Sequence, residues 1–226
     1  MTLHENLASI NKRLEKAALK AQVPRESITL VAVSKSVSKE AIEQAWKFGI
    51  RHFGENRVQE ALSKIPSLPS AIHWHFVGRL QTNKVRHVIE HVQLIQSLDR
   101  MKLAHVLQNE GEKHERVIET LLQVNIGDEK SKSGFQPSEV NRALEEIAGL
   151  SNLKVLGLMT IAPFFPNVEE VRPYFRAMND LFTGSHIPNI EMKYLSMGMT
   201  HDFEIAVEEG ANMIRLGTGL FGERDN

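Results

Sequence analysis

Short apolar, β-branched segments alternate with amphipathic segments along almost the whole chain, and this alternation most constrains the fold. A strand that is buried on both faces has a nearly continuous apolar sequence, as residues 29–35 do. Seven more strands are expected at 50–53, 73–77, 92–96, 120–125, 155–159, 192–195 and 213–216. Helices are expected at 39–48, 57–65, 81–90, 99–109, 137–148, 168–181 and 200–209. Because parallel strands need a crossover helix between them, this order predicts an α/β protein with a parallel sheet.

Eight strand–helix units are the number that closes a (β/α)8 barrel, and 226 residues fit the size of that fold. We therefore expect a single TIM barrel, one domain over residues 1–226. An extra N-terminal helix is expected, because apolar residues recur there at helical spacing: Leu3, Leu7, Ile10 and Leu14. A doubly wound open sheet is the structural alternative.

The composition excludes several classes of partner and chemistry. The chain has 27 Lys+Arg and 28 Asp+Glu, a net charge of −1, which argues against a nucleic acid or an anionic membrane as partner. It has no Cys, which excludes disulfides, thiolate nucleophiles and Cys-based zinc sites and suits a reducing compartment. No apolar run approaches the ~18 residues of a membrane span, and the N-terminal segment lacks the apolar core of a secretory signal. We expect a cytoplasmic protein.

Lys35 is the first candidate for a reactive residue, and it stands at the end of a strand. Val31, Val33 and Lys35 share one face of that strand, because side chains alternate with a period of two. An apolar pocket desolvates the ammonium form of a lysine, and the neutral amine can then form a Schiff base with a carbonyl. The alternative is a structural lysine whose head reaches solvent beyond the strand end.

Two glycine-bearing segments follow the last two strands. In the first, 196–200 (SMGMT), Gly198 allows close approach of the backbone, and the hydroxyls of Ser196 and Thr200 can hold an anion together with nearby amides. The alternative is an ordinary turn in which Thr200 caps the next helix. The second segment, 217–219 (GTG), opens another short helix. Barrels commonly bind phosphate at these two strand ends, so the pair predicts a phosphate site.

Three further side chains at strand ends have two interpretations each. Arg215 lies inside the last strand, where a permanent charge needs either a ligand or a buried ion pair with an acid such as Glu55 or Asp202. Asn56 either binds a ligand or caps the helix that follows it. Met159 either forms an apolar wall of a ligand pocket or packs in the core.

The chemistry that these residues share indicates the ligand. An aldehyde-reactive lysine beside a phosphate cradle fits pyridoxal phosphate, and a sugar phosphate bound by a class I aldolase is the other ligand of that shape. His73 and His75 share a strand face in a pattern that can seat a metal. No acidic or histidine cluster elsewhere completes a ligand set with clear spacing, so we predict no metal site.

Six segments together resemble a known family. They are VAVSK (31–35), FGENRVQEA (53–61), WHFVGRLQTNK (74–84), KSGF (132–135), GLMTI (157–161) and SMGMTHDFEIAVEEGANMIRLGTGLFGER (196–224). In this order, over nearly the whole chain, they resemble the YggS/PROSC family of pyridoxal-phosphate-binding proteins. The resemblance implies a single-domain barrel of the alanine-racemase-like type, fold type III, with a role in pyridoxal phosphate homeostasis and little or no turnover.

The resemblance also implies roles for matched residues. Lys35 matches the Schiff-base lysine, Arg215 the residue beside the pyridine nitrogen, and Asn56 and Met159 the lining of the ring pocket. The residues implied for the phosphate site, with neighbouring amides, are Ser196, Gly217 and Thr218, and Gly198 and Met199 join the cofactor-binding set. Two departures are small: Arg57 stands where the family often has an aromatic residue, and Thr200 where it often has Ser.

An arginine beside the pyridine nitrogen has a chemical consequence of its own. Enzymes that use the ring as a strong electron sink place a carboxylate there to keep the nitrogen protonated. Arg215 would instead donate a hydrogen bond and disfavour a proton at that atom. Such a site holds the cofactor but stabilises a carbanion poorly, so we expect no catalytic residues.

Three alternatives to a cofactor carrier stay open: an amino-acid racemase of the same fold type, a Schiff-base aldolase and a pure interaction protein. A racemase needs bases on both faces of its substrate, and those enzymes take the second, a tyrosine, from an added β-domain. The eight units use nearly the whole length, and the only tyrosines are Tyr174 and Tyr194. The expected partners are pyridoxal phosphate and, transiently, apoenzymes that receive it, with no nucleic acid and no membrane; we expect a monomer.

Overall fold

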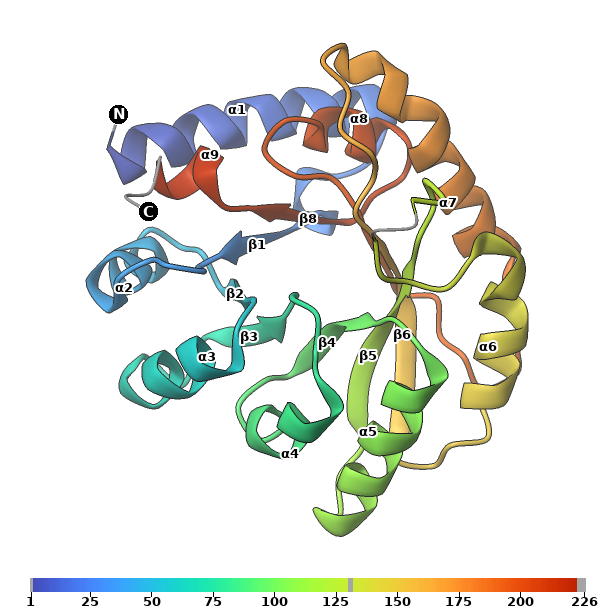
Figure 1. The fold of residues 1–226 in the computed structure, drawn as a ribbon. Coiled ribbons are helices and arrows are strands. Elements are labelled where there is room, and N and C mark those ends of the chain that lie inside the picture. Colours follow the sequence, from blue (N-terminus) through green and yellow to red (C-terminus); the bar gives the residue numbers. More distant parts are fainter. Residues whose placement is uncertain (1, 130–131, 223–226) are drawn as a thin grey trace.

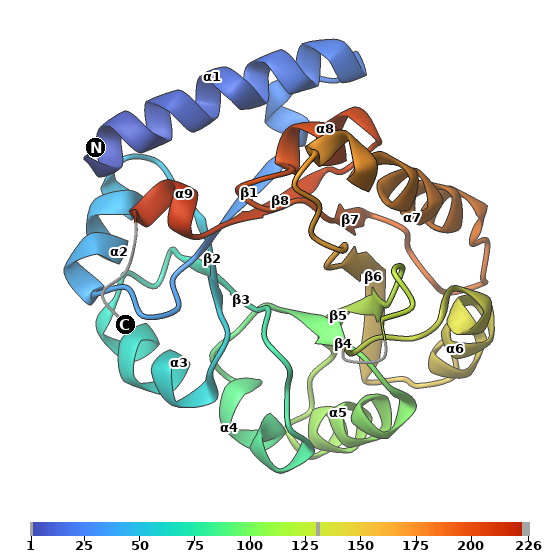
Figure 2. The same cartoon turned by 45° about the horizontal axis from the view of Figure 1, so that its top comes forward.

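Eight parallel strands close into a barrel with helices around it. The structure, a computed structural model, describes residues 2–129 and 132–222. The strands pair in sequence order, and β8 returns to pair with β1 (Figures 1 and 2). They are β1 (Thr29–Val33), β2 (His52–Glu55), β3 (His73–Phe76), β4 (Leu94–Leu98), β5 (Ile118–Val124), β6 (Leu153–Thr160), β7 (Tyr194–Ser196) and β8 (Met213–Leu216). The predicted (β/α)8 barrel is confirmed, and the open sheet is excluded because it would leave two edges unpaired.

Helices follow the strands on the outside of the barrel. In the described residues they are α1 (Leu3–Ala21), α2 (Lys39–Lys47), α3 (Val58–Lys64), α4 (Val85–Val88), α5 (Met101–Lys113), α6 (Val140–Ile147), α7 (Arg172–Gly184), α8 (Phe203–Glu208) and α9 (Thr218–Phe221). Within this part of the chain, no helix combines the length and apolar character that a membrane crossing requires. Residues 223–224, the end of the matched segment 196–224, lie outside the described residues.

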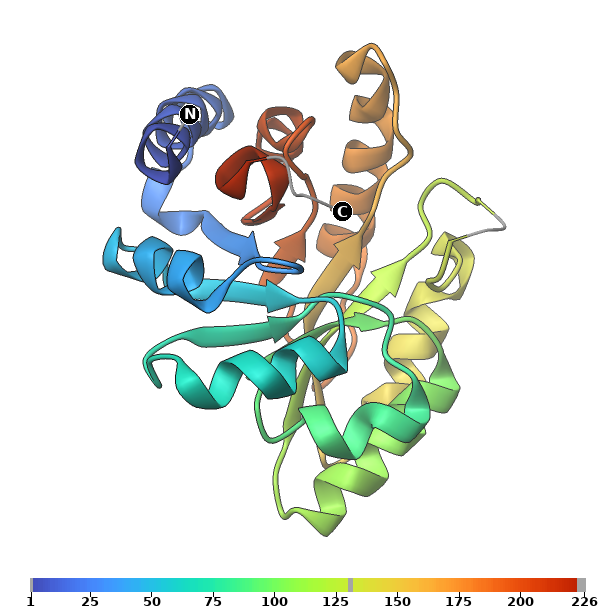
Figure 3. The same cartoon turned by 60° about the vertical axis from the view of Figure 1, so that its left-hand side comes forward.

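The predicted N-terminal helix is α1, which packs against α8 and α9 (Figure 3). The Oγ1 atom of Thr2 accepts the N–H of Glu5 at 3.3 Å, and the Glu5 carboxylate accepts the N–H of Thr2 at 2.8 Å. This reciprocal pair is a capping box, which fixes where the helix begins. Leu7, Ile10 and Leu14 are buried, as their helical spacing predicted.

Some element boundaries differ from the predicted ones, because backbone hydrogen bonds end a helix at a different residue. β2 begins two residues later than predicted, since the N–H of Ile50 donates to the Ala45 carbonyl and completes the end of α2. The helix predicted at 81–90 is reduced to a 3-10 turn and the four residues of α4. There the N–H of His91 donates to the Val88 carbonyl and ends the helix. The order of strands and helices is unchanged.

Apolar side chains fill one layer inside the barrel: Val31, Leu94, Leu121, Leu156, Met159 and Met213. Leu156 and Met159 both belong to this layer, although strict alternation would place them on opposite faces of β6. The strand is irregular between them, because Gly157 has a φ of +137° and the register between β5 and β6 shifts. A Cβ atom at Gly157 would lie 1.9 Å from the carbonyl oxygen of Tyr194, so this bulge requires glycine.

Polar side chains form a hydrogen-bonded chain across the same interior. Arg215 Nη1 donates to Ser196 Oγ at 2.5 Å, and Ser196 Oγ donates to Gln96 Oε1 at 2.7 Å. Gln96 Nε2 lies 2.8 Å from His75 Nδ1, and His75 Nε2 lies 3.0 Å from His52 Nδ1. We call these five residues the interior chain. It runs from β8 through β7, β4 and β3 to β2.

The interior chain requires a neutral His75. Because Nδ1 of His75 accepts the Gln96 amide, the ring proton stands on Nε2 and is donated to His52. Burial, with a smaller contribution from the neighbouring rings of His52 and His73, lowers the pKa of His75 to about 3. Burial also lowers the pKa of His52, with the ring of His73 acting in the same direction. The barrel interior therefore holds its histidines as uncharged hydrogen-bonding groups.

We predict that His75 makes folding stability depend on pH. The pKa of His75 is about 3 in the folded chain and 6.5 ordinarily, so between these values only the unfolded chain takes up the proton. The contribution of neutral His75 to the free energy of unfolding is therefore fully present above pH 6.5, and it decreases as the pH falls toward 3. At ~1.4 kcal/mol per pKa unit, the loss reaches about 5 kcal/mol at most.

Urea unfolding at a series of pH values measures this effect. His75→Phe should flatten the dependence below pH 6.5, because its ring cannot take up a proton. His87→Asn, at an exposed histidine of α4, is the matched control and should keep the dependence of the unmodified protein. An undiminished dependence in His75→Phe would contradict the assignment.

Candidate functional site

The residues singled out in the sequence gather where the strands end. Lys35 follows β1 by two residues, Asn56 directly follows β2, and Ser196 is the last residue of β7. Met159 and Arg215 each stand one residue before the end of their strands, β6 and β8. In a (β/α)8 barrel this C-terminal face is where ligands bind. Closure of the sheet thus brings to one face residues that are far apart in the sequence.

A buried ion cluster lies beside the end of β1. Lys64 Nζ contacts Glu55 Oε1 at 3.0 Å and Glu60 Oε2 at 2.9 Å, and we call these three residues the Lys64 cluster. Burial raises the pKa of Glu55, while the Ser34 hydroxyl, which donates to its Oε1 at 2.7 Å, and the Lys64 ammonium act in the opposite direction. The partner of Glu55 is therefore Lys64, and the predicted alternative, an ion pair with Arg215, is not formed.

The Lys64 cluster holds both neighbours of Lys35. Lys64 Nζ donates to the Ser34 carbonyl at 2.8 Å, and the N–H of Ser36 donates to Glu60 Oε2 at 2.7 Å. Ser36 adopts a left-handed backbone with a φ of +58°, so the chain turns sharply just after the lysine. Lys35 itself is half-buried. Its backbone is thus fixed on both sides.

Asn56 carries an unpartnered acceptor. Its Oδ1 atom is buried and has no hydrogen-bond partner in the described part of the chain. The N-cap of α3 is Arg57, with no side-chain capping bond, so Asn56 does not cap that helix as the structural alternative required. Asn56 lines a cavity of about 310 Å³ at the ends of β2, β3, β5 and β6. A buried oxygen that lacks a donor fits a ligand hydroxyl.

Arg215 is a buried guanidinium that neutral groups hold. It donates to Ser196 Oγ and also to the carbonyl of Thr160, at 2.7 Å. No carboxylate of the described residues pairs with it. Burial lowers the pKa of Arg215 to about 10, and the negative charge of Asp202 acts in the opposite direction. Asp202 instead accepts the N–H of Met199 at 2.6 Å, so the second predicted ion-pair alternative is also not formed. Part of the donor capacity of the guanidinium stays available to a ligand.

The two glycine-bearing segments lie against each other. The N–H of Gly219 donates to Thr200 Oγ1 at 3.2 Å, and a Cβ atom at Gly219 would lie 2.4 Å from Thr200 Cγ2. Thr200 does not cap the next helix, because α8 begins only at Phe203. Gly217 and Thr218 open α9, and Thr218 is exposed. The two segments together form one surface at the ends of β7 and β8.

The first segment divides between the surface and the barrel interior. Gly198 is buried with a φ of +89°, and a Cβ atom there would meet Ala206 Cβ at 2.5 Å. Met199 is 40% exposed beside it. Ser196 points the other way, because its hydroxyl is shared between Arg215 and Gln96 in the interior chain. Its role in phosphate binding stays a prediction, and its observed bonds belong to Arg215.

In the described residues, His73 and His75 have ring contacts and hydrogen bonds but no set of metal-ligating side chains around them. His73 stacks on His52 with ring centroids 4.9 Å apart, and His75 belongs to the interior chain. In the part of the chain that the structure describes, no three His, Cys, Asp or Glu side chains are placed to hold a metal ion.

The sequence reasoning missed three contributors: Gln96, His52 and Lys64. A signal existed for Gln96, a polar residue that shares a strand face with Leu94 in an apolar strand. His52 shows no such signal, because Arg51 stands beside it and the expected strand 50–53 is not uniformly apolar. Lys64 sits in a helix where a charged residue is normally solvated, and only the fold places it against Glu55.

Comparisons with known proteins show the family and the fold of this chain. A family model described as alanine racemase, N-terminal domain, matches residues 6–225. A pyridoxal phosphate homeostasis protein of Aquifex aeolicus is 44% identical over 226 residues, covering 99% of this chain and 99% of the relative. PipY of Synechococcus elongatus PCC7942, solved with PLP bound, is 36% identical with a TM-score of 0.80, covering 98% of this chain and 100% of that chain.

A more distant structure gives the wider fold class. An alanine racemase of Clostridium difficile is 16% identical with a TM-score of 0.69, covering 99% of this chain and 56% of that chain, and shows the fold alone. The family match and the full-length relatives confirm the resemblance that the six sequence segments carry. This chain belongs to the alanine racemase N-terminal domain family and, within it, to the pyridoxal phosphate homeostasis proteins.

Proposed function

We propose that this protein binds pyridoxal 5′-phosphate as a Schiff base on Lys35 and acts in intracellular pyridoxal phosphate homeostasis. In this role a single-domain, monomeric, cytoplasmic barrel holds the cofactor, passes it transiently to apoenzymes and catalyses little or nothing. The observation that carries the proposal is Arg215, a buried guanidinium at the ligand face with no carboxylate partner in the described residues. The relatives named for this role and the PLP-bound structure of PipY support it.

The residues at the barrel face fit this cofactor. When bound, pyridoxal phosphate supplies an aldehyde, with which a lysine amine condenses reversibly with loss of water. Lys35 stands on a backbone that the Lys64 cluster fixes, and its half-buried side chain offers that amine. The unpartnered Oδ1 of Asn56 offers an acceptor to the hydroxyl of the ring. Met159 is fully buried and packs in the interior layer beneath the same face.

In this proposal Arg215 is the residue that lets the site bind the cofactor without activating it for catalysis. Its guanidinium would donate to the pyridine nitrogen and keep a proton off that atom. Two neutral acceptors, Ser196 Oγ and the Thr160 carbonyl, fix the guanidinium without neutralising it. We assign Arg215 to the ring end and the phosphate to the surface formed by 198–200 and 217–219, with Ser196 between them.

The two tyrosines are not placed as a second racemase base. Tyr194 begins β7, at the end of the barrel opposite to Lys35, and packs against the interior apolar layer. Tyr174 stacks on Phe165 on the outer helix α7. No observation therefore favours racemisation over holding the cofactor.

We predict that colour reports the Schiff base directly. Protein purified with pyridoxal phosphate should be yellow, and borohydride should fix the cofactor on the peptide that contains Lys35. Lys35→Ala should lose the visible absorbance band, because no amine remains at that position. Lys39→Ala, an exposed lysine on α2, is the control that should keep it. A colourless protein that takes up no added pyridoxal phosphate would overturn the proposal.

We also predict that the Lys64 cluster supports the site. Lys64→Met leaves Glu55 buried without its cation, which should lower the free energy of unfolding by about 3 kcal/mol and weaken cofactor binding. The pKa of Glu55 is raised by burial, so the loss should shrink below that pKa, where a protonated carboxyl needs no cation. Urea unfolding and cofactor titration measure both effects.

Lys47→Met is the matched control for this substitution. Lys47 makes an exposed ion pair with Glu43, which should change the free energy of unfolding by less than about 1 kcal/mol. Equal losses in Lys47→Met and Lys64→Met would show that burial of the cluster does not matter.

A further inference from the structure

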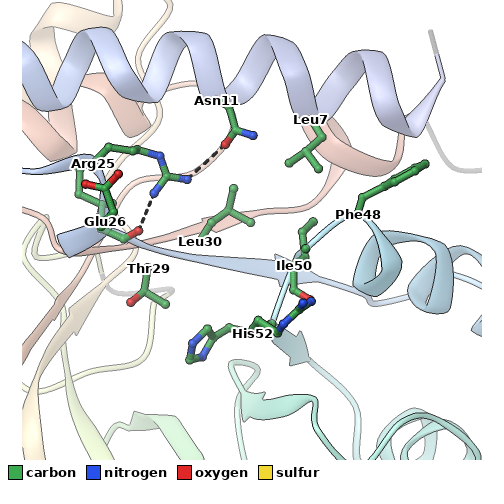
Figure 4. Close-up of a pocket in the computed structure, with 12 residues that line it drawn as sticks. Leu7, Asn11, Arg25, Glu26, Thr29, Leu30, Phe48, Ile50 and His52 are labelled. Atoms are coloured by element: carbon green, nitrogen blue, oxygen red, sulfur yellow. Dashed lines mark hydrogen bonds between the residues drawn. The ribbon is translucent and has the colours of Figure 1, made fainter.

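The interior chain links the ligand face to the opposite end of the barrel. Arg215 stands at the end of β8, and the chain passes through Ser196 to Gln96 on β4, across the barrel. It continues through His75 to His52, the first residue of β2. His52 and Thr29 line a cavity of about 420 Å³ at the N-terminal end of the barrel, below α1 (Figure 4). One line of hydrogen bonds thus spans the core.

Each bond in the interior chain fixes the direction of the next. Arg215 can only donate, so Ser196 Oγ must accept from it and send its single proton elsewhere. The Oε1 atom of Gln96 receives that proton at 2.7 Å. If the amide turned round, its N–H2 group would face Ser196 and leave the hydroxyl proton without this acceptor.

The other side of Gln96 fits the same orientation. Its Nε2 atom lies 3.2 Å from Met213 Sδ, which can only accept, and 2.8 Å from His75 Nδ1, which accepts in the tautomer that carries its proton on Nε2. Gln96 and Ser196 are fully buried, so no water replaces a lost partner. In this orientation both ends of the amide have hydrogen-bond partners, and Ser196 is held where Arg215 needs an acceptor.

We propose that Gln96 is a positioning residue of the cofactor site, which acts through Ser196 to aim Arg215 at the ring nitrogen of the bound cofactor. This inference rests on the proposed function. Gln96 lies in the barrel interior and acts without touching the ligand. His75 supports it from behind by offering a bare Nδ1 atom to the amide.

A comparison of two ligands separates aiming from general support of the fold. The probes are pyridoxal phosphate and 1-deazapyridoxal phosphate, in which a C–H group replaces the ring nitrogen. Cofactor-free protein is titrated with each, with quenching of tryptophan fluorescence as the readout. Arg215 can donate a hydrogen bond only to the ligand with a ring nitrogen, so the unmodified protein should bind pyridoxal phosphate more tightly than the deaza ligand.

Gln96→Leu should lower the affinity for pyridoxal phosphate about ten-fold, the size of one lost hydrogen bond to a charged group, and leave the affinity for the deaza ligand nearly unchanged. Gln96→Glu should keep most of the preference for pyridoxal phosphate, because a carboxylate also accepts from Ser196. The other tautomer of His75 carries its proton on Nδ1 and can donate it to that carboxylate. Leu156→Met, at an interior residue outside the chain, should leave both affinities unchanged.

The outcomes distinguish the two proposals. An unmodified protein that binds neither ligand overturns the proposed function itself. An unmodified protein that prefers pyridoxal phosphate, with the same preference in Gln96→Leu, overturns only the role of Gln96. Equal losses for both ligands in Gln96→Leu assign it to the fold, and this outcome also overturns the proposal. If Gln96→Leu does not fold, His75→Phe tests the same chain one step further back and should lose the preference in part.

Discussion

The site depends on one constraint: a guanidinium buried at the end of β8 that has no carboxylate partner among the described residues. A buried charge normally takes an opposite charge as its partner, because desolvation is costly. Arg215 has instead a hydroxyl and a backbone carbonyl. These acceptors orient the group without cancelling its charge. A charge kept in this way can act on a ligand, and it explains why the polar residues around it form a continuous chain.

The lysine end of the site meets the problem of buried charge differently. The Lys64 cluster places its cation between two carboxylates, so its charges offset one another and serve only to hold the backbone on either side of Lys35. Lys64 thus has a structural role, whereas Lys35 is the residue proposed to carry the chemistry. The barrel pairs its buried charge in the Lys64 cluster and leaves Arg215 without a carboxylate partner among the described residues.

The sequence predicted the parts of this site that depend on local order along the chain. Strand periodicity placed Lys35 and Arg215 at strand ends, and eight repeated units predicted the barrel that brings them to one face. The interior chain was beyond such reasoning, because it depends on register. Gln96 meets Ser196 only after the sheet closes, and Met159 enters the interior only because of the bulge at Gly157. Single residues of that kind leave no periodic signal.

The same dependence on register couples the site to the core. Of the four residues behind Arg215, Ser196 and Gln96 are fully buried in the packed barrel interior, and His75 must stay neutral to accept from Gln96. A ligand that bonds to Arg215 therefore stabilises an arrangement that extends to His52 at the far end, and it stabilises the folded barrel by mass action. This arrangement has a consequence for the proposed carrier role. An arginine aimed at the ring nitrogen, with no carboxylate among the described residues to protonate the ring, would hold the cofactor firmly while giving a bound carbanion little support. Holding and inertness would then follow from one interaction.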